Sequence, residues 1–294
     1  MMGKGKREKQ KSKKGTLVLI ILLVIVIIIA GVLLAMKILN KGTQEVVTEE
    51  VQEQKEPEKK LQIVDEDSKT RPYAVMINNN HQAWPQCGLS DAYLVYEIIT
   101  EGGITRMMAL FKDADTAKIG SIRSARHYFL DYVQENDAIF VHWGGSDRAY
   151  SEISSRGIND IDGIALEGSV FFRDRTLKRD LEHTGFTSME NVKEYAEKKG
   201  QTRDTNKDLL LNYSVDEIDL STMENAEIAN DITIKYSDYH TTSYEYDEEN
   251  KVYLRSMSGQ KNVDLVTGEQ YTAKNILVYK VKNYSFDNYG RQEL

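Results

Sequence analysis

The chain has 294 residues and a formal net charge of −8. Its first fourteen residues hold seven Lys or Arg and one Glu, which leaves a net charge of −14 on the remainder. This acidic balance argues against a nucleic-acid binder, which needs cations to neutralise phosphates. The single cysteine, Cys87, excludes an intramolecular disulfide and is expected to be a small buried residue.

An apolar run near the N-terminus indicates a membrane anchor. The run from Thr16 to Met36 has no charged residue and, as a helix, is long enough to cross a hydrocarbon core of roughly 30 Å. Residues 1–15 form a basic tail, and positive residues beside a span stay in the cytoplasm. We therefore expect a transmembrane helix over residues 16–37 in a single-pass cell-membrane protein with a cytoplasmic N-terminus and an extracellular C-terminal domain. A cleaved signal peptide would have a shorter apolar core and a small-residue cleavage site.

Composition divides the rest of the chain into three parts. Residues 38–70 are rich in Glu, Gln and Lys without an aromatic residue, which predicts a disordered acidic stalk. An α/β (α+β) domain is expected over residues 71–225. A mainly antiparallel β domain is expected over residues 226–294, and it looks truncated because the chain ends soon after a strong strand.

Periodicity and turn signals predict the elements of the first domain. The runs 93–100 and 104–112 suggest a hairpin around Glu101-Gly102-Gly103, although Ser90 could instead start a helix in the first run. Ser124 can cap a helix over 124–136, and Thr187 with Glu190 forms a capping-box pattern. The further expected elements are strands 73–77 and 138–142 and helices 147–155 and 187–199.

The second domain shows period-two alternation. Ile232, Ile234 and Tyr236 alternate with polar residues, and similar runs flank residues 247–250. This pattern predicts an antiparallel meander from Asp231. The apolar run 275–281 predicts one more strand.

Two arginines at an expected helix start suggest an anion site. Arg123 and Arg126 are three residues apart, so they would share one helix face beside free backbone N–H groups. Cations there oppose the helix dipole, which calls for a compensating anion. Bound phosphate or carboxylate could supply it, and so could Glu101 or Asp131 within the fold. The residues expected to bind such a ligand are Arg106, Arg123, Ser124 and Arg126.

Two histidines are candidates for proton transfer. His142 ends a predicted strand before Gly144-Gly145, the position where ligands gather in α/β sheets. His183 is the second candidate, and either could work with Glu101 or Asp147. The structural alternative is a histidine that is simply hydrogen-bonded at a strand end. No metal-ligand spacing or cofactor fingerprint is present, so neither a metal nor a cofactor is expected.

Several uncommon strings occur in a familiar order. RPYAVMINNN, PQCGLSDAYLVYE, EGGITR, IGSIRSAR and HWGGS, followed by YSDYHTTSYEYD and VDLVTGEQ, resemble the DUF3048 family, which includes YerB-like bacterial lipoproteins. The resemblance runs from about Arg71 to the C-terminus and implies an envelope-facing protein, without implying an activity. Such relatives are lipid-anchored through a cysteine, whereas this chain has an apolar span.

Three functions follow as hypotheses. The first is a module that binds an anionic wall polymer or an envelope protein through the arginines. The second is a hydrolase or transferase that acts on wall glycan or phosphodiester, with the arginines stabilising the transition state. The third is a structural role in envelope assembly, for which Arg123 and Arg126 would both pair with internal carboxylates.

Overall fold

The computed structural model describes residues 8–40, 61–288 and 290–294. The chain divides into two units, Met1–Lys59 and Lys60–Leu294, which are described separately. Residues 1–7 of the predicted tail and residues 41–60 of the predicted stalk lie outside the described residues.

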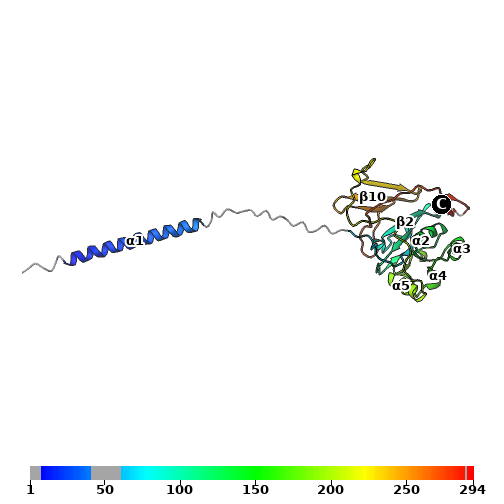
Figure 1. The fold of residues 1–294 in the computed structure, drawn as a ribbon, viewed down its shortest axis with the longest axis horizontal. Coiled ribbons are helices and arrows are strands. Elements are labelled where there is room, and N and C mark those ends of the chain that lie inside the picture. The colour runs from blue at the N-terminus through cyan, green and yellow to red at the C-terminus, as the bar shows by residue number, and fades with distance from the viewer. Residues whose placement is uncertain (1–7, 41–60, 289) are drawn as a thin grey trace, which may run out of the picture. The chain divides into compact units, whose positions relative to one another are not determined.

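The first unit contains one long helix, α1, over Glu8–Asn40 (Figure 1). It starts before the expected residue 16, because the Lys, Gln and Glu residues ahead of the apolar run are good helix formers. Within it, Ile20–Lys37 has a mean hydropathy of 3.1 and is long and apolar enough to cross a membrane. The helix is therefore consistent with membrane anchoring.

The second unit is built on a five-stranded sheet of order β2-β3-β1-β5-β6. The central strand β1 pairs antiparallel with β3 and parallel with β5. The chain leaves β1 towards one side of the sheet and later crosses to the other, so the carboxyl ends of β1 and β5 are neighbours. The strands are β1 Tyr73–Asn78, β2 Leu94–Ile99, β3 Thr105–Phe111, β5 Ile139–His142 and β6 Asp160–Asp162.

Helices cover both faces of this sheet. Alternate residues of β1 belong to two different hydrophobic clusters, as the period of two in a strand requires. One cluster includes residues of α5, Met189–Lys198, and the other includes residues of α2, Leu130–Glu135, and α3, Asp147–Ser155. The expected mixed α/β class is confirmed.

The helix expected over 124–136 is shorter than predicted. Residues 127–129 form a 3₁₀ turn and α2 begins only at Leu130. The backbone before it is already paired: Arg123 N–H donates to Met76 O, and Ala125 N–H donates to Gly144 O. Because these amides bond to neighbouring segments, they are not free donors of a helix N-terminus. Arg123 therefore lies outside any helix start, and Arg126 is only the N-cap residue of the 3₁₀ turn.

Most other predicted elements of the first domain occur. The β2–β3 hairpin forms, and the alternative helix from Ser90 is only a 3₁₀ turn, Leu89–Asp91. Helix α3 has the expected bounds. Helix α5 is capped by Ser188, which accepts a hydrogen bond from Asn191 N–H, one residue later than the expected Thr187. Val64 is buried, so packing begins within the region assigned to the stalk.

The C-terminal sheet is the expected meander, with order β12-β11-β10-β9 and β13 beside β11 (Figure 1). The described residues 275–281 form no strand, because no strand of the described part pairs with them and β propensity alone does not hold a strand. The remaining elements are β4 Ile119–Gly120, β7 Phe172–Arg173, β8 Gly185–Thr187, β9 Asp231–Lys235, β10 Thr241–Asp247, β11 Val252–Met257, β12 Gln260–Lys261, β13 Thr272–Ala273, β14 Tyr284–Ser285, β15 Gln292–Glu293 and the short helix α4 Gly163–Leu166.

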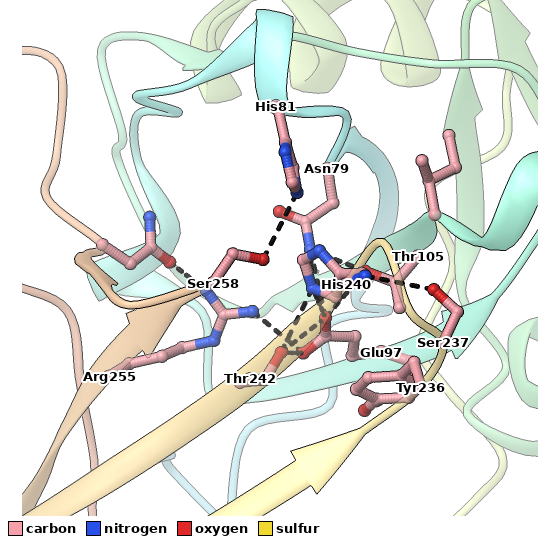
Figure 2. A network of polar contacts seen from close by, with 12 residues as sticks. Asn79, His81, Glu97, Thr105, Tyr236, Ser237, His240, Thr242, Arg255 and Ser258 are labelled. Atoms are coloured by element: carbon pink, nitrogen blue, oxygen red, sulfur yellow. Dashed lines mark hydrogen bonds and ion pairs between the residues drawn. The ribbon is translucent and has the colours of Figure 1, made fainter.

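A buried polar network joins this sheet to β2 (Figure 2). Glu97 of β2 accepts hydrogen bonds from Thr105 Oγ1 at 2.7 Å and Asn79 Nδ2 at 3.0 Å. Arg255 Nη2, from the C-terminal sheet, donates to Glu97 Oε2 at 2.9 Å. His240 Nε2, just before β10, lies 3.0 Å from Glu97 Oε1. This network, rather than apolar contact alone, fixes the two sheets together.

Candidate functional site

A cleft of about 480 Å³ opens beyond the carboxyl ends of β5 and β6. One wall is the extended segment that follows β4 and runs beside β1, and another is the loop after β5. In α/β sheets this edge, where the strand order changes direction, is the usual ligand position. The lining residues are Ile122, Arg123, Ser124, Trp143, Gly144, Gly145, Tyr150, Ile164, Arg173 and Glu182.

Arg123 meets a carboxylate across the cleft. Its Nη2 donates to Glu182 Oε2 at 2.6 Å, and this hydrogen bond lowers the pKa of Glu182. The Arg123 side chain is 28% exposed and the Glu182 side chain 53% exposed. An ion pair as exposed as this contributes at most about 1 kcal/mol, so its partners can exchange readily.

Arg173 is held more firmly. Its guanidinium carbon lies 4.0 Å from the centre of the Trp143 ring, and its Nη1 donates to Leu181 O at 2.5 Å. The ring lies against the backbone of Gly163 and Gly185, where an added Cβ would approach ring atoms to 2.6 Å. The two glycines thus let Trp143 lie flat, and Trp143 in turn supports Arg173.

Hydrogen bonds connect polar groups of the cleft lining to one another and to Arg106 and Asp162, which do not line it. Ser124 Oγ donates to Trp143 O at 3.1 Å, and Arg106 Nη1 donates to Ser124 O at 2.7 Å. Tyr150 Oη and Gly144 N–H both donate to Asp162, each at 2.7 Å. Burial lowers the pKa of Arg106 to about 9, so this guanidinium is still protonated at neutral pH. Arg106 therefore supports the cleft from behind.

Arg126 lies apart from this cleft. Its Nε and Nη2 donate to the two oxygens of Glu101 at 2.5 and 3.2 Å, in the forked geometry of a strong pair. Burial raises the pKa of Glu101, but the contacts with Arg126 outweigh this and lower it. Glu101 thus neutralises Arg126 as the structural hypothesis expects, whereas Arg123 is both paired and open to the cleft.

The candidate catalytic residues do not converge. His142 is fully buried, with Nδ1 2.8 Å from Gly144 O and Nε2 3.1 Å from Asp160 Oδ2. His183 is also buried, between Asn78 Nδ2 at 2.9 Å and Gln82 Oε1 at 3.2 Å, and burial lowers its pKa. Asp147 is exposed at the start of α3.

No metal centre is apparent in the described ranges 8–40, 61–288 and 290–294, where no three His, Cys, Asp or Glu side chains could together hold a metal ion. The arrangement offers cation and hydrogen-bond donors instead. Sequence reasoning found Arg123, Ser124 and the glycine loop of this site, but it missed Arg173 and Glu182. The signal for Arg173 was its place after Phe171-Phe172, where a cation follows aromatic surface.

Comparison with known proteins places this geometry in a family. Residues 60–202 match the "Protein of unknown function (DUF3048) N-terminal domain" and residues 232–294 match the corresponding C-terminal domain. The chain belongs to the DUF3048 family. The sequence-level resemblance is thereby confirmed, and the matched segments include every residue that lines the cleft.

A Bacillus subtilis (strain 168) protein of this family, named "Putative lipoprotein YerB", is 32% identical over 227 residues. The match covers 76% of this chain and 66% of that protein, so the chain spans just under two thirds of its relative. The crystal structure of the YerB protein from Bacillus subtilis matches with a TM-score of 0.66 and 30% identity, over 78% of this chain and 76% of that chain. These relatives and the apolar α1 are consistent with an envelope-associated DUF3048 protein.

Proposed function

We propose that this DUF3048 protein is a membrane-anchored binding protein whose cleft takes an anionic ligand of the cell envelope. The observation that carries the proposal is the meeting of Arg123 and Arg173 on one cleft at the carboxyl ends of the parallel strands. Guanidinium groups bind phosphate and carboxylate through paired, charge-assisted hydrogen bonds. The rest of the chain is acidic, so its overall charge does not attract polyanions. An anionic ligand would therefore bind at this local pair of cations and not over the general surface.

Binding can be measured by calorimetry on the full chain in a non-ionic detergent, with inorganic phosphate and a glycerol phosphate oligomer as probes. Each of Arg123→Ala and Arg173→Ala should lower the affinity tenfold or more, since a hydrogen bond to a charged group contributes about 1.5–3 kcal/mol. Arg126→Ala is the matched control and should stay within twofold. No binding of either probe, or equal loss in all three variants, would contradict the proposal.

A hydrolase or transferase role has less support from the geometry. His142 and His183 are buried and hydrogen-bonded, and neither lines the cleft. The cleft does contain Arg123 and Arg173, which could stabilise charge, but no histidine among the described residues lines it. His183 is buried, and its contact with the cleft lining is with the Glu182 carboxylate, at 3.5 Å. We therefore favour binding over turnover, and over a purely structural role because Arg123 faces the cleft.

We further propose that the N-terminus is cytoplasmic and that the Lys60–Leu294 unit is extracytoplasmic. The seven Lys or Arg residues before the apolar run support this orientation. In intact cells expressing the chain with Cys87→Ala, a membrane-impermeant maleimide should label Thr48→Cys and spare Ser12→Cys until the membrane is opened. The reverse pattern would overturn the orientation. If Thr48→Cys is labelled after membrane opening and denaturation but Ser12→Cys is not, the N-terminal segment has been removed, and the uncleaved anchor is wrong.

A further inference from the structure

Glu182 occupies the position on Arg123 that a ligand's oxyanion would take. Its Oε2 accepts from Arg123 Nη2 at 2.6 Å, and its Oε1 lies 3.5 Å from His183 Nε2. The neighbouring Leu181 carbonyl accepts from Arg173. The turn Leu181–His183 therefore contacts both cleft guanidiniums with its own oxygens.

Some residues of this turn are buried and others are exposed to solvent. His183 and Thr184 are buried, whereas the Leu181 and Glu182 side chains are more than half exposed. The backbone of the turn is thus anchored, while the Glu182 carboxylate is free to move into solvent. Since an exposed ion pair is weak, moving this one side chain costs little free energy.

We propose that Glu182 is a displaceable internal anion that selects for phosphate-type ligands in the cleft. This inference rests on the proposed function of the same site. An intramolecular carboxylate competes at an effective concentration in the millimolar range or above. A lone carboxylate that meets only Arg123 therefore competes poorly with Glu182. A phosphate group has more oxygens and more charge, so it can bind Arg123 and Arg173 together and displace Glu182.

The Arg173 side of the cleft fits the same exchange. Arg173 also pairs with a carboxylate, because its Nε lies 3.3 Å from Glu167 Oε1 and its Nη2 lies 3.4 Å from Glu167 Oε2. The Glu167 side chain is 46% exposed. The stack on Trp143 and the bond to Leu181 O hold the guanidinium in place when that carboxylate leaves. Each cleft guanidinium thus pairs with an exposed carboxylate, Arg123 with Glu182 and Arg173 with Glu167. Arg173 is in addition held in place by Trp143 and by Leu181 O.

The test compares Glu182→Gln with the unchanged chain, using the full protein in non-ionic detergent. Inorganic phosphate, glycerol phosphate and acetate are the soluble probes. Phosphatidylglycerol incorporated into the detergent micelles is a further probe, which distinguishes a lipid headgroup from a soluble phosphate. The unchanged chain should bind both phosphates and leave acetate unbound at millimolar concentration. Glu182→Gln should bind phosphate at least fivefold more tightly and bind acetate measurably.

Glu190→Gln is the control, because it removes the same charge from an exposed position outside the cleft. It should change phosphate affinity by less than twofold. Equal affinities of Glu182→Gln and the unchanged chain would overturn the role of Glu182, while a loss of binding in Arg123→Ala would still support the cleft. If acetate binds the unchanged chain as tightly as phosphate, the selection for phosphate is wrong.

Discussion

Arg255 on β11 donates through Nη2 to Glu97 Oε2 on β2 at 2.9 Å, joining the C-terminal sheet to the edge of the central sheet (Figure 2). The two side chains are only 10% and 9% exposed. A buried pair of this kind need not add stability over apolar residues, but removing one partner leaves an uncompensated charge. The pair therefore makes the association of the two sheets sensitive to a single substitution.

Glu97→Gln should destabilise the folded chain by about 3 kcal/mol, because Arg255 would lose its buried counter-charge. For a unit of this size, that corresponds to a fall in melting temperature of about 6–12 °C. Thermal unfolding followed by tryptophan fluorescence measures it. Glu245→Gln on β10 is the matched control, since Glu245 is exposed, and it should change melting by less than 2 °C. Equal melting of the two variants would show that the pair is dispensable.

The same carboxylate predicts an acid transition. Burial alone would raise the pKa of Glu97, but Arg255 and the hydrogen bonds from His240 and Thr105 outweigh burial and lower it to about 2. Because the folded pKa lies below the ordinary value of 4.5, the stabilisation is complete above pH 4.5 and is lost as the pH falls towards 2. The stabilisation of the folded state by the lowered pKa of Glu97 is about 3 kcal/mol.

Urea unfolding at pH 6, 4 and 3 measures this loss. Glu97→Gln removes the titrating group, so its stability should fall less steeply between pH 4.5 and 2 than that of the unchanged chain. Parallel pH profiles for the two proteins would show that other groups cause the acid transition.

The sequence predicted the secondary-structure elements better than the contacts between them. Strand periodicity and turn glycines are local signals, so the β2–β3 hairpin, helix α3 and the C-terminal meander were predictable. The helix expected from Ser124 failed because Met76 and Gly144 accept hydrogen bonds from that segment, and these partners are remote in sequence. The strand expected over 275–281 failed for the complementary reason, since it has no pairing partner in the described part.

The candidate site, too, could be predicted only in part from the sequence. The position of a ligand site after β5 follows from the general behaviour of α/β sheets. Arg123 and Ser124 were predicted to bind a ligand, but at the start of a helix and not at this edge of the sheet. The pairing of Arg123 with Glu182 joins residues 59 positions apart, and the support of Arg173 by Trp143 requires two glycines from separate elements. No local pattern reports such contacts. Arg126 is an example. Its spacing from Arg123 predicted that both side chains would share one site, but the backbone is not helical there and Arg126 lies outside the cleft.

The glycines beneath Trp143 give a prediction on the cleft itself. Gly185→Ala would bring a methyl group to 2.6 Å from the Trp143 ring, so the ring must shift and carry Arg173 with it. We expect a destabilisation of about 1–3 kcal/mol and a loss of phosphate affinity. Gly145→Ala is the control in the loop after β5, because its methyl group would lie 3.3 Å from the partly exposed Tyr150 ring and not against Trp143. It should retain most of the affinity, and a reversed order of the two variants would contradict the supporting role of Trp143.

Cys87 provides a reporter of global unfolding. Its side chain is fully buried, and burial raises the pKa of the thiol to about 12. Because the thiolate is the reactive form, the folded chain should react with an aromatic disulfide reagent at pH 8 at least about a hundredfold more slowly than the chain in denaturant. A Cys87→Ala variant gives the background, since it leaves no other thiol. Fast reaction of the folded protein would mean that the segment around Cys87, which bridges to Gly120, opens locally without global unfolding.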